Sequence, residues 1–368
     1  MYETKHTALA GRLKNAIRKG TYTGKLPGVH ALAAEYGVNF KTMNKAVNAL
    51  VNEGLLITRK GEGRFVASSP DGVRAGVIAL LVRTEGHLFS DLAAGLVRHA
   101  QARGMTAMVM DAPTFDGSRA ATARLREHKA GALITDIASE AARDFVEQHG
   151  REFRHVVVLG RHGGNLTCPV SRVHADAHHG MRTATTRLLD AGRRNVALMH
   201  YEWVYGTDGY EHTEHGLTVE GYRSALRSRR IAKRQRFMWV TSDDDSNERA
   251  LRSLFADEAT RPDGLVTYMD SRAVWACRIL ADLGLRVPED VAVIGYNNTP
   301  WCELVQPRLT SVSVKEDELA RLAVAKAAEA QPVLEDVVVT PELVVRESCG
   351  TAGGAPGGRA RRGSRKRR

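Results

Sequence analysis

The chain has 368 residues, more than one ordinary domain needs, and its 43% hydrophobic content can build more than one core. No apolar run is long enough for a membrane span, and the first residues lack the apolar stretch of a signal peptide. Four scattered cysteines with no Cys-x-x-Cys pair argue against a disulfide framework and a cysteine zinc site, so we expect a reduced, cytoplasmic protein.

Positive charge is concentrated at the two ends of the chain. Residues 1–70 hold 11 basic and 4 acidic residues, and residues 351–368 hold 7 basic residues and no acidic residue. The region between them is close to neutral, although the whole chain has a formal net charge of +11. We therefore expect a polyanionic partner to meet the ends of the chain rather than its middle.

The first seventy residues predict three helices followed by two short strands. Apolar residues at helical spacing mark the helices, and Asn39 is a good N-cap for the third one. A glycine-rich turn between the strands predicts a hairpin. The expected helices are residues 8–19, 30–36 and 40–52, and the expected strands are residues 55–58 and 64–67.

Two helices joined by a short turn, the second with a basic and amide-rich face, predict a helix-turn-helix that binds the major groove of DNA. Lysine and asparagine side chains can bind base edges there, lysine also neutralises phosphates, and the hairpin would form a wing. Phe40 has two open interpretations, contact with a thymine methyl group or burial under the helix. The predicted DNA-binding residues are His30, Asn39, Phe40, Lys41, Thr42, Asn44, Lys45, Lys60, Gly61 and Arg64.

Several motifs make this region resemble the GntR-type winged helix over its whole length. They include Leu26-Pro27, Tyr36-Gly37-Val38, Glu53-Gly54-Leu55 and Gly61-Glu-Gly-Arg-Phe65-Val66. The resemblance implies binding to double-stranded operator DNA. His30, Phe40 and Asn44 stand where the family often uses arginine to grip DNA, so the operator sequence of relatives does not transfer to this chain.

From residue 74 onward, continuous apolar strands alternate with helices. This alternation predicts an α/β fold class with parallel sheets that are covered by helices on both faces. Ligands of such folds bind outside the carboxyl ends of the strands. The expected strands are residues 77–82, 104–110, 132–135, 156–159, 195–199, 237–240, 264–267 and 291–294.

An enzyme is the alternative from another functional class. The region has no Gly-x-Gly-x-x-Gly after its first strand, no phosphate-loop lysine motif and no Gly-x-Ser-x-Gly elbow. His174, His178 and His179 form a cluster without a partner at diagnostic metal-ligand spacing, which favours a helix start at Asp176 over a metal site. We predict no catalytic set, cofactor or metal, and keep a sugar-processing enzyme with a basic nucleic-acid-binding appendage as the alternative.

Residues 74–348 resemble the effector domain of LacI/GalR-type regulators, which is similar to periplasmic sugar-binding proteins. The longest matching segment runs from Leu283 to Tyr296, and Pro307-Arg-Leu-Thr310 also matches. With its winged helix, the chain resembles arabinose-repressor-like hybrid regulators over nearly its whole length. We expect a winged helix in residues 1–70, a two-lobed effector domain in residues 71–350 with crossovers near residues 173–178, 307–312 and 333–338, and a disordered basic tail in residues 351–368.

This second resemblance implies an effector cleft between the lobes and a repressor that works as a homodimer on operator DNA. A carbohydrate is the expected effector, held by aromatic faces and polar groups. Thr218 and Asn297 replace an arginine and an aspartate that are common in sugar-binding relatives, which favours an uncharged effector. By motif position, the predicted effector-binding residues are Leu88, Phe89, Asp136, Arg161, His212, Glu214, Thr218, Asp270, Asn297 and Trp301.

Overall fold

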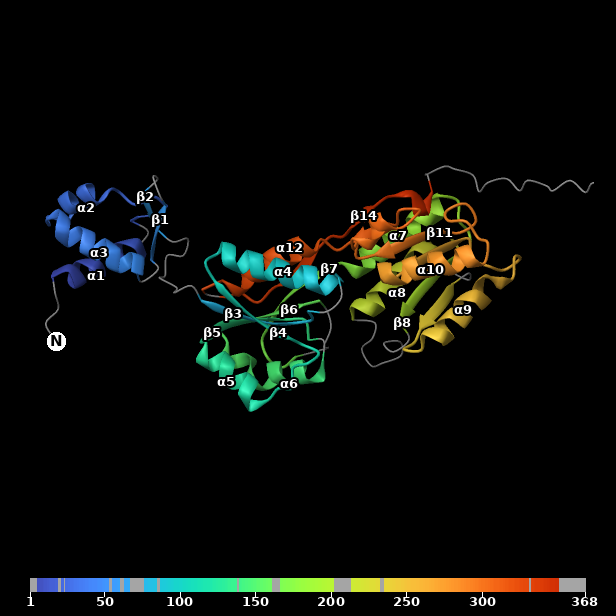
Figure 1. Cartoon of the computed structure of the whole chain (residues 1–368), viewed down its shortest axis with the longest axis horizontal. Coiled ribbons are helices and arrows are strands. Elements are labelled where there is room, and N and C mark those ends of the chain that lie inside the picture. Colours follow the sequence, from blue (N-terminus) through green and yellow to red (C-terminus); the bar gives the residue numbers. More distant parts are fainter. Residues whose placement is uncertain are drawn as a thin grey trace, which may run out of the picture.

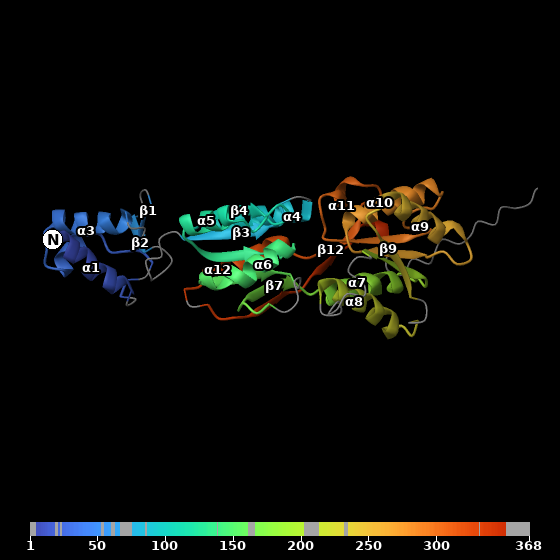
Figure 2. The same ribbon diagram turned by 90° about the horizontal axis from the view of Figure 1, so that it is seen from below.

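The computed structural model describes residues 5–18, 21–22, 24–52, 55–59, 63–66, 76–84, 87–137, 139–160, 166–201, 213–231, 235–330 and 332–350. These residues form a winged helix and two α/β lobes, each lobe built around a six-stranded sheet (Figure 1). Figure 2 shows the three bodies following one another along the long axis. The predicted α/β fold class with an N-terminal winged helix-turn-helix is confirmed. No helix in the described ranges is long and apolar enough to cross a membrane.

The winged helix has a small apolar core under its recognition helix. Leu13, Leu32 and Leu50, one from each helix, are fully buried in that core. The side chain of Asn39 caps the third helix, because its Oδ1 accepts a hydrogen bond from the backbone N–H of Thr42 at 2.8 Å. The elements are α1 (Lys5–Arg18), α2 (Val29–Glu35), α3 (Phe40–Asn52) and the antiparallel strands β1 (Leu56–Arg59) and β2 (Gly63–Val66).

The first lobe contains a parallel sheet with the strand order β13-β7-β6-β5-β3-β4. Its strands are β3 (Val77–Val82), β4 (Thr106–Asp111), β5 (Ala130–Thr135), β6 (His155–Leu159), β7 (Ser171–Ala175) and β13 (Asp336–Val339). Helices α4 (His87–Ala102) and α12 (Glu316–Ala327) cover one face, and α5 (Arg119–Glu127), α6 (Glu140–His149) and the short η1 (Gly150–Glu152) cover the other (Figure 1). The central strands are buried from both sides, which explains their continuous apolar sequence.

The second lobe contains a sheet with the strand order β14-β12-β11-β10-β8-β9. Its strands are β8 (Val196–Tyr201), β9 (Arg236–Val240), β10 (Gly264–Thr267), β11 (Ala292–Tyr296), β12 (Thr310–Ser313) and β14 (Glu342–Val344). Only β14 runs antiparallel, and it is a short edge strand whose partial exposure gave no strand signal in the sequence. Helices α7 (Ala177–Asp190) and α8 (Glu214–Ser228) pack on one face, and α9 (Asp244–Ala256), α10 (Asp270–Asp282) and α11 (Trp301–Leu304) pack on the other.

The chain passes between the two sheets three times, after Ala175, after Ser313 and after Val339. The second and third passages follow the expected ranges by a few residues, because β12 and β13 run to the carboxyl edges of their sheets before the chain crosses. One cluster of buried residues extends from the α4/α12 face of the first sheet to the α7/α8 face of the second. The two lobes therefore share part of their apolar core.

Candidate DNA interface and effector site

The recognition helix α3 has a buried face and a basic face. Met43 and Val47 are fully buried, whereas Lys41 and Lys45 are exposed to solvent. This division follows from the helical spacing of the apolar residues. Exposed lysines on this helix can neutralise DNA phosphates, as the sequence predicts. Lys60 and Gly61, the predicted contacts from the wing, lie outside the described residues.

Arg64 of strand β2 reaches the recognition helix. Its Nη2 donates hydrogen bonds to Oδ1 of Asn48 at 2.9 Å and to Oδ1 of Asn44 at 3.4 Å. A guanidinium group only donates, so both amide oxygens are turned toward Arg64 and the amide NH₂ groups are left for other partners. Arg64, one of the predicted DNA-binding residues, thus supplies a positive charge beside α3, but its contacts with Asn44 and Asn48 were not predicted from the sequence.

Phe40 and His30 form a pair of stacked rings at the start of the recognition helix. Their centroids are 4.4 Å apart, and Phe40 is 42% exposed. Phe40 is therefore not buried under the recognition helix, which excludes the second of its two interpretations. Contact with a thymine methyl group remains a prediction.

Arg83 and Asp136 form an ion pair at the carboxyl edge of the first lobe's sheet. Arg83 follows β3 and Asp136 follows the neighbouring strand β5. The Nε and the backbone N–H of Arg83 donate to Oδ2 of Asp136 at 2.8 and 3.1 Å. Asp136 is 4% exposed, whereas the side chain of Arg83 is 30% exposed. The buried carboxylate holds a guanidinium that stays accessible, and Arg83 was missed although it is the first charged residue after an apolar strand.

Aromatic side chains form a continuous row across the second lobe's sheet, on the face that α7 and α8 cover, and we call this set the aromatic row. The row runs from Tyr296 at the carboxyl end of β11 to Phe237 near the amino end of β9. Its members come from β11, β10, β8 and β9, which are neighbours in that order. Successive ring centroids are 5.7, 4.7, 6.3 and 5.1 Å apart. The row consists of Tyr296, Tyr268, His200, Trp239 and Phe237. None of these was among the predicted effector-binding residues, because the neighbourhood of these rings depends on the strand order of the folded sheet.

His200 is the most unusual member of the aromatic row. It is 1% exposed, and burial lowers its pKa to about 4. Its Nδ1 lies 3.4 Å from the carbonyl oxygen of Tyr201, while its Nε2 has no hydrogen-bond partner among the described residues. The ring of His215, at the start of α8, packs 5.2 Å from His200 and 4.8 Å from Tyr268.

Asp270 is buried and fixes the loop that follows β11. Its Oδ2 accepts hydrogen bonds from the backbone N–H and hydroxyl of Thr299 at 2.6 and 2.9 Å, and its Oδ1 accepts one from the Ser311 hydroxyl at 2.5 Å. Burial raises the pKa of Asp270, and these hydrogen bonds oppose the rise. A Cβ at Gly295 would lie 2.3 Å from Oδ1, so glycine is needed there. Asp270 thus holds the loop that carries Asn297.

The remaining predicted effector residues are spread more widely. Asn297 is 7% exposed with a φ of 98°, and Thr218 is fully buried with its hydroxyl donating to the Glu214 carbonyl at 2.8 Å. Glu214 begins α8. Trp301 lies in α11, whose Cys302 joins the core on the sheet face opposite the aromatic row. Two further predicted residues, Arg161 and His212, lie outside the described part of the chain. Leu88 and Phe89 belong to α4, but their side chains are not among those described.

The histidines near Asp176 have separate environments. Asp176 caps α7 by accepting a hydrogen bond from the backbone N–H of His179 at 2.9 Å. His174 is buried, with its Nε2 2.8 Å from the carboxylate of Asp336. In the part of the chain that the structure describes, no three His, Cys, Asp or Glu side chains are grouped to hold a metal ion.

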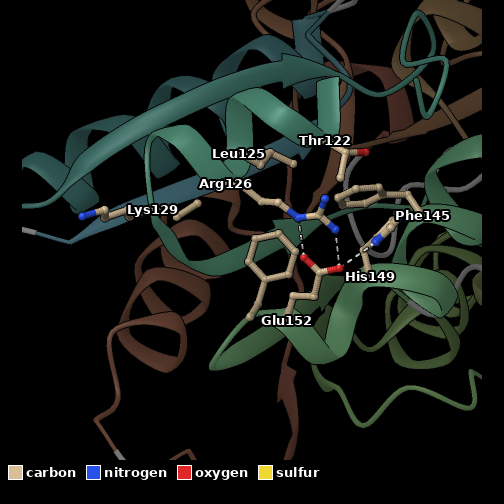
Figure 3. A pocket seen from close by; sticks show the side chains of 9 residues that line it. Thr122, Leu125, Arg126, Lys129, Phe145, His149 and Glu152 are labelled. Atoms are coloured by element: carbon tan, nitrogen blue, oxygen red, sulfur yellow. Dashed lines mark hydrogen bonds and ion pairs between the residues drawn. The ribbon is translucent and has the colours of Figure 1, made fainter. Parts of the chain in front are cut away.

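A separate pocket of about 210 Å³ lies in the first lobe between α5, α6 and η1 (Figure 3). Phe145 and Phe153 line it, and at its rim the Nε and Nη2 of Arg126 donate to both carboxylate oxygens of Glu152 at 2.9 and 2.8 Å. Arg126 and His149 lower the pKa of Glu152 to about 2. The pocket also contacts Ala130, the first residue of β5, so it lies at the amino edge of the sheet rather than at the edge where such folds bind ligands.

Two family descriptions match separate parts of the chain. Residues 5–66 match the bacterial regulatory proteins of the gntR family, and residues 185–349 match the periplasmic binding protein-like domain. The arabinose metabolism transcriptional repressor of Halalkalibacterium halodurans is 23% identical over 95% of this chain and 98% of its own length. The regulator CelR of Thermobifida fusca is 32% identical, but over only 49% of this chain and 52% of its own length.

Solved structures give the same result for the fold. A LacI-family transcriptional regulator from Sanguibacter keddieii is 26% identical, with a TM-score of 0.58 over 75% of this chain and all of that one. A complex of the transcriptional regulator CelR with cellobiose has a TM-score of 0.61 and 21% identity, covering 88% of this chain and all of that one. The chain is a hybrid transcriptional regulator in which a GntR-type winged helix precedes a LacI-type, periplasmic-binding-protein-like domain.

Proposed function

We propose that this chain represses transcription as a homodimer on a palindromic operator, and that a sugar bound between its lobes controls operator affinity. The observation that supports the sugar site is the Arg83–Asp136 ion pair on one lobe together with Tyr268, a partly exposed member of the aromatic row that directly follows β10, on the other. Sugar sites combine polar groups that bind hydroxyls with aromatic faces that stack on the ring. The arabinose repressor that aligns over almost the whole chain supports the same function.

Two arguments support the homodimer: the two-fold symmetry of a palindromic operator, and the exposure of large apolar side chains on the second lobe. Two recognition helices related by a two-fold axis would meet the two halves of a palindromic operator. Trp301, Leu304 and Val345 of the second lobe are 42%, 74% and 53% exposed, an unusual exposure for large apolar side chains. Burial of these three side chains against a second copy is the proposed dimer contact. Because a regulator acts where its operator DNA is, we propose that this chain works in the cytoplasm.

The enzyme alternative gains no support from the geometry. The arabinose and ribose repressors that this chain resembles are transcriptional regulators, and the buried carboxylate of Asp270 holds the loop after β11. We therefore propose that the chain is not an enzyme. Product analysis after incubation with a carbohydrate panel tests this proposal, and any turnover would contradict it.

The central experiment tests operator binding and its control by a sugar together. Operator sequences are selected from random duplex DNA with the purified full chain, and their binding is followed by fluorescence anisotropy. L-arabinose, D-ribose and cellobiose are then titrated into the complex. The first two are chosen because relatives are named as repressors of arabinose metabolism and of the ribose operon, and the third because the CelR structure is a complex with cellobiose. We expect at least one sugar to shift operator affinity. Tight operator binding that none of them changes would contradict sugar control, and failure to select any operator would contradict the repressor.

A further inference from the structure

We infer that the second lobe has a DNA-binding surface of its own, which binds the sugar-phosphate backbone of a second duplex away from the winged helix. The surface is built by helices α7 and α8 and by the residues that follow each of them. It is separate from the recognition helix and from the space between the lobes, so it does not depend on the proposed sugar site.

Positive charge is concentrated in one part of the effector domain, although the domain as a whole is close to neutral. Residues 177–194 and 220–236 together hold 11 basic and 2 acidic residues. The rest of residues 71–350 holds 24 basic and 36 acidic residues. The near-neutral total therefore hides a segment of the middle of the chain that can attract a polyanion.

The fold brings these residues to one edge of the second lobe. Strands β8 and β9 are parallel neighbours, so α7 before β8 and α8 before β9 both end at the amino edge of the sheet. An ion pair between Asp190, at the end of α7, and Arg229, directly after α8, joins the two helix ends. The Nε of Arg236 donates to Oδ1 of Asn195 at 2.8 Å and joins the starts of the two strands. Charges that are far apart in the sequence thus share one surface.

The arginines of this surface exceed the carboxylates that could neutralise them. Arg227 and Arg229 each pair with one of the two carboxylates of these ranges. Arg182 and Arg230 are exposed, and neither guanidinium has a partner among the described residues. We call the following set the basic face: Arg182, Arg223, Arg227, Arg229 and Arg230.

Two further carboxylates at the amino edge have partners outside the basic face. Asp263, directly before β10, accepts a hydrogen bond from the backbone N–H of Arg194 at 2.9 Å. Asp290 pairs with Arg286 at 2.9 Å. The guanidinium groups of the basic face are therefore left to bind phosphate.

The basic tail starts beside the same helix. Gly350, the last described residue, accepts a hydrogen bond at its carbonyl oxygen from Nη2 of Arg187 on α7 at 2.6 Å. The residues that follow, 351–368, hold 7 basic residues and no acidic residue. A segment of this length spans at most about 60 Å when extended, so its charge stays within reach of the basic face.

The composition of the basic face fits a nucleic-acid backbone better than a protein partner. Ten of the 11 basic residues are arginines, whose planar guanidinium groups bind phosphate oxygens in pairs. A protein interface has an apolar core inside its polar rim. Among the described residues, the large exposed apolar side chains, such as Trp301 and Val333, all lie outside residues 177–194 and 220–236. Phosphate contacts need no apolar core and read no sequence.

The position of the basic face assigns it to a second duplex. Figure 2 shows the first lobe between the winged helix and the second lobe, which contains α7 and α8. A short operator duplex that is held by the recognition helix therefore lies away from the basic face. The chain can then bridge two stretches of DNA, one bound by sequence at the winged helix and the other bound by charge at the second lobe.

The first test measures nonspecific DNA binding without the contribution of the winged helix. The parent protein is the full chain with Lys41→Glu and Lys45→Glu, which reverse two exposed charges of α3. Binding of a fluorescent duplex of random sequence is followed by anisotropy from low to high salt. The probe for an acidic protein partner is poly-L-glutamate, titrated in the same way by competition.

Two triple variants of this parent remove the same number of positive charges. The basic-face variant carries Arg182→Gln, Arg227→Gln and Arg230→Gln. The control variant carries Arg249→Gln, Arg278→Gln and Arg321→Gln, which change exposed arginines of α9, α10 and α12. A third variant ends at residue 350 and lacks the basic tail.

The basic-face variant should bind the duplex about tenfold more weakly at low salt. Each phosphate contact adds about 0.9 to the slope of log K against log salt, so the slope should become less steep by about 2 to 3. The shortened chain should also show a less steep slope, and the control variant should match the parent. Equal slopes for the basic-face and control variants overturn the inference, as does a loss that only removal of the tail produces. Tighter binding of poly-L-glutamate than of DNA overturns it in favour of an acidic protein.

The second test measures whether one protein holds two duplexes. Operator duplex on beads is saturated with a chain that has the unchanged winged helix, and capture of a labelled random duplex is measured. We expect the chain and its control variant to capture the second duplex, and the basic-face variant to capture about tenfold less while binding the operator equally well. Equal capture by all three overturns the bridging role. If no operator can be selected, the proposed repressor fails, while the salt series still decides on the basic face.

Thermal unfolding of each variant checks that it folds. If the triple basic-face variant does not fold, the single changes Arg182→Gln and Arg230→Gln replace it, because neither breaks an ion pair among the described residues. Each should then lower the salt slope by about 1. A slope that neither single change alters would overturn the inference as well.

Discussion

Arg64 on the wing strand and Asn48 on the recognition helix are joined by a hydrogen bond of 2.9 Å. The bond fixes the orientation of an amide on the helix that is expected to enter the major groove, and it ties the wing to that helix. We therefore expect Arg64→Met to reduce operator affinity by about 1–3 kcal/mol and to narrow the difference between operator and random DNA. Anisotropy titrations with both duplexes measure this. A loss that is equal for the two duplexes would assign Arg64 to phosphate contact alone.

Asn44 and Lys60 are expected to play different parts in DNA binding. Asn44 lies on the recognition helix, where its amide NH₂ group can reach base edges, so Asn44→Ala should relax operator choice. Lys60→Ala should weaken binding to all DNA about equally, because a wing lysine contacts phosphate. Selection from random duplex DNA with each variant compares the two. Identical selected sequences for Asn44→Ala and the wild type would refute the role of Asn44.

DNA binding by the full chain should depend strongly on salt. The positive charge of residues 1–70 is expected to displace counterions from DNA, and each phosphate contact adds to the slope of log K against log salt. Removing residues 351–368 takes away 7 basic residues. If the tail also contacts phosphates, the shortened chain should show a less steep slope of log K against log salt than the full chain. Nonspecific binding that is unchanged between low and high salt would contradict the electrostatic contribution.

Asn297 offers a test in which stability and ligand binding change in opposite directions. Its φ of 98° strains any residue with a side chain, so Asn297→Gly should raise the free energy of unfolding by up to about 1 kcal/mol. The same change removes an amide proposed to bind the effector, and affinity should fall by about 5- to 150-fold. Thermal unfolding and calorimetry read the two effects separately. A folded variant with unchanged effector affinity would remove Asn297 from the site.

Glu316, the first residue of α12, should make stability depend on pH. Burial raises its pKa from 4.5 to about 7, with contributions from Asp270 and Asp91. The folded chain therefore keeps a proton that the unfolded chain loses, and stability should fall as pH rises between these values. Glu316→Gln should be more stable than the wild type at pH 8 by about 1–3 kcal/mol, with the difference vanishing near pH 4.5. Parallel pH series of thermal unfolding, with Glu318→Gln as control, measure it; identical series for wild type and Glu316→Gln would contradict it.

The sequence carried enough information for the fold but not for the site. Val77–Val82 and Gly264–Thr267 are continuous apolar runs in sheets covered on both faces, and their bounds agree with the predicted strands. The spacing of apolar residues does not reveal β14, because this strand is short and half exposed at a sheet edge. His200 and Tyr268 were missed because their role depends on which strands are neighbours, and strand order is a property of the folded sheet. Arg83 was missed for the same reason, since its partner follows a different strand.

The three passages between the lobes have a consequence for the order in which the chain becomes structured. Strand β13 and helix α12 belong to the first lobe, yet they follow the whole of β8–β12 along the chain. During synthesis the winged helix, whose contacts are local, can fold as soon as it leaves the ribosome, whereas the first lobe must wait for its last strand. A newly made chain therefore has its DNA-binding surface before it has a completed place for an effector.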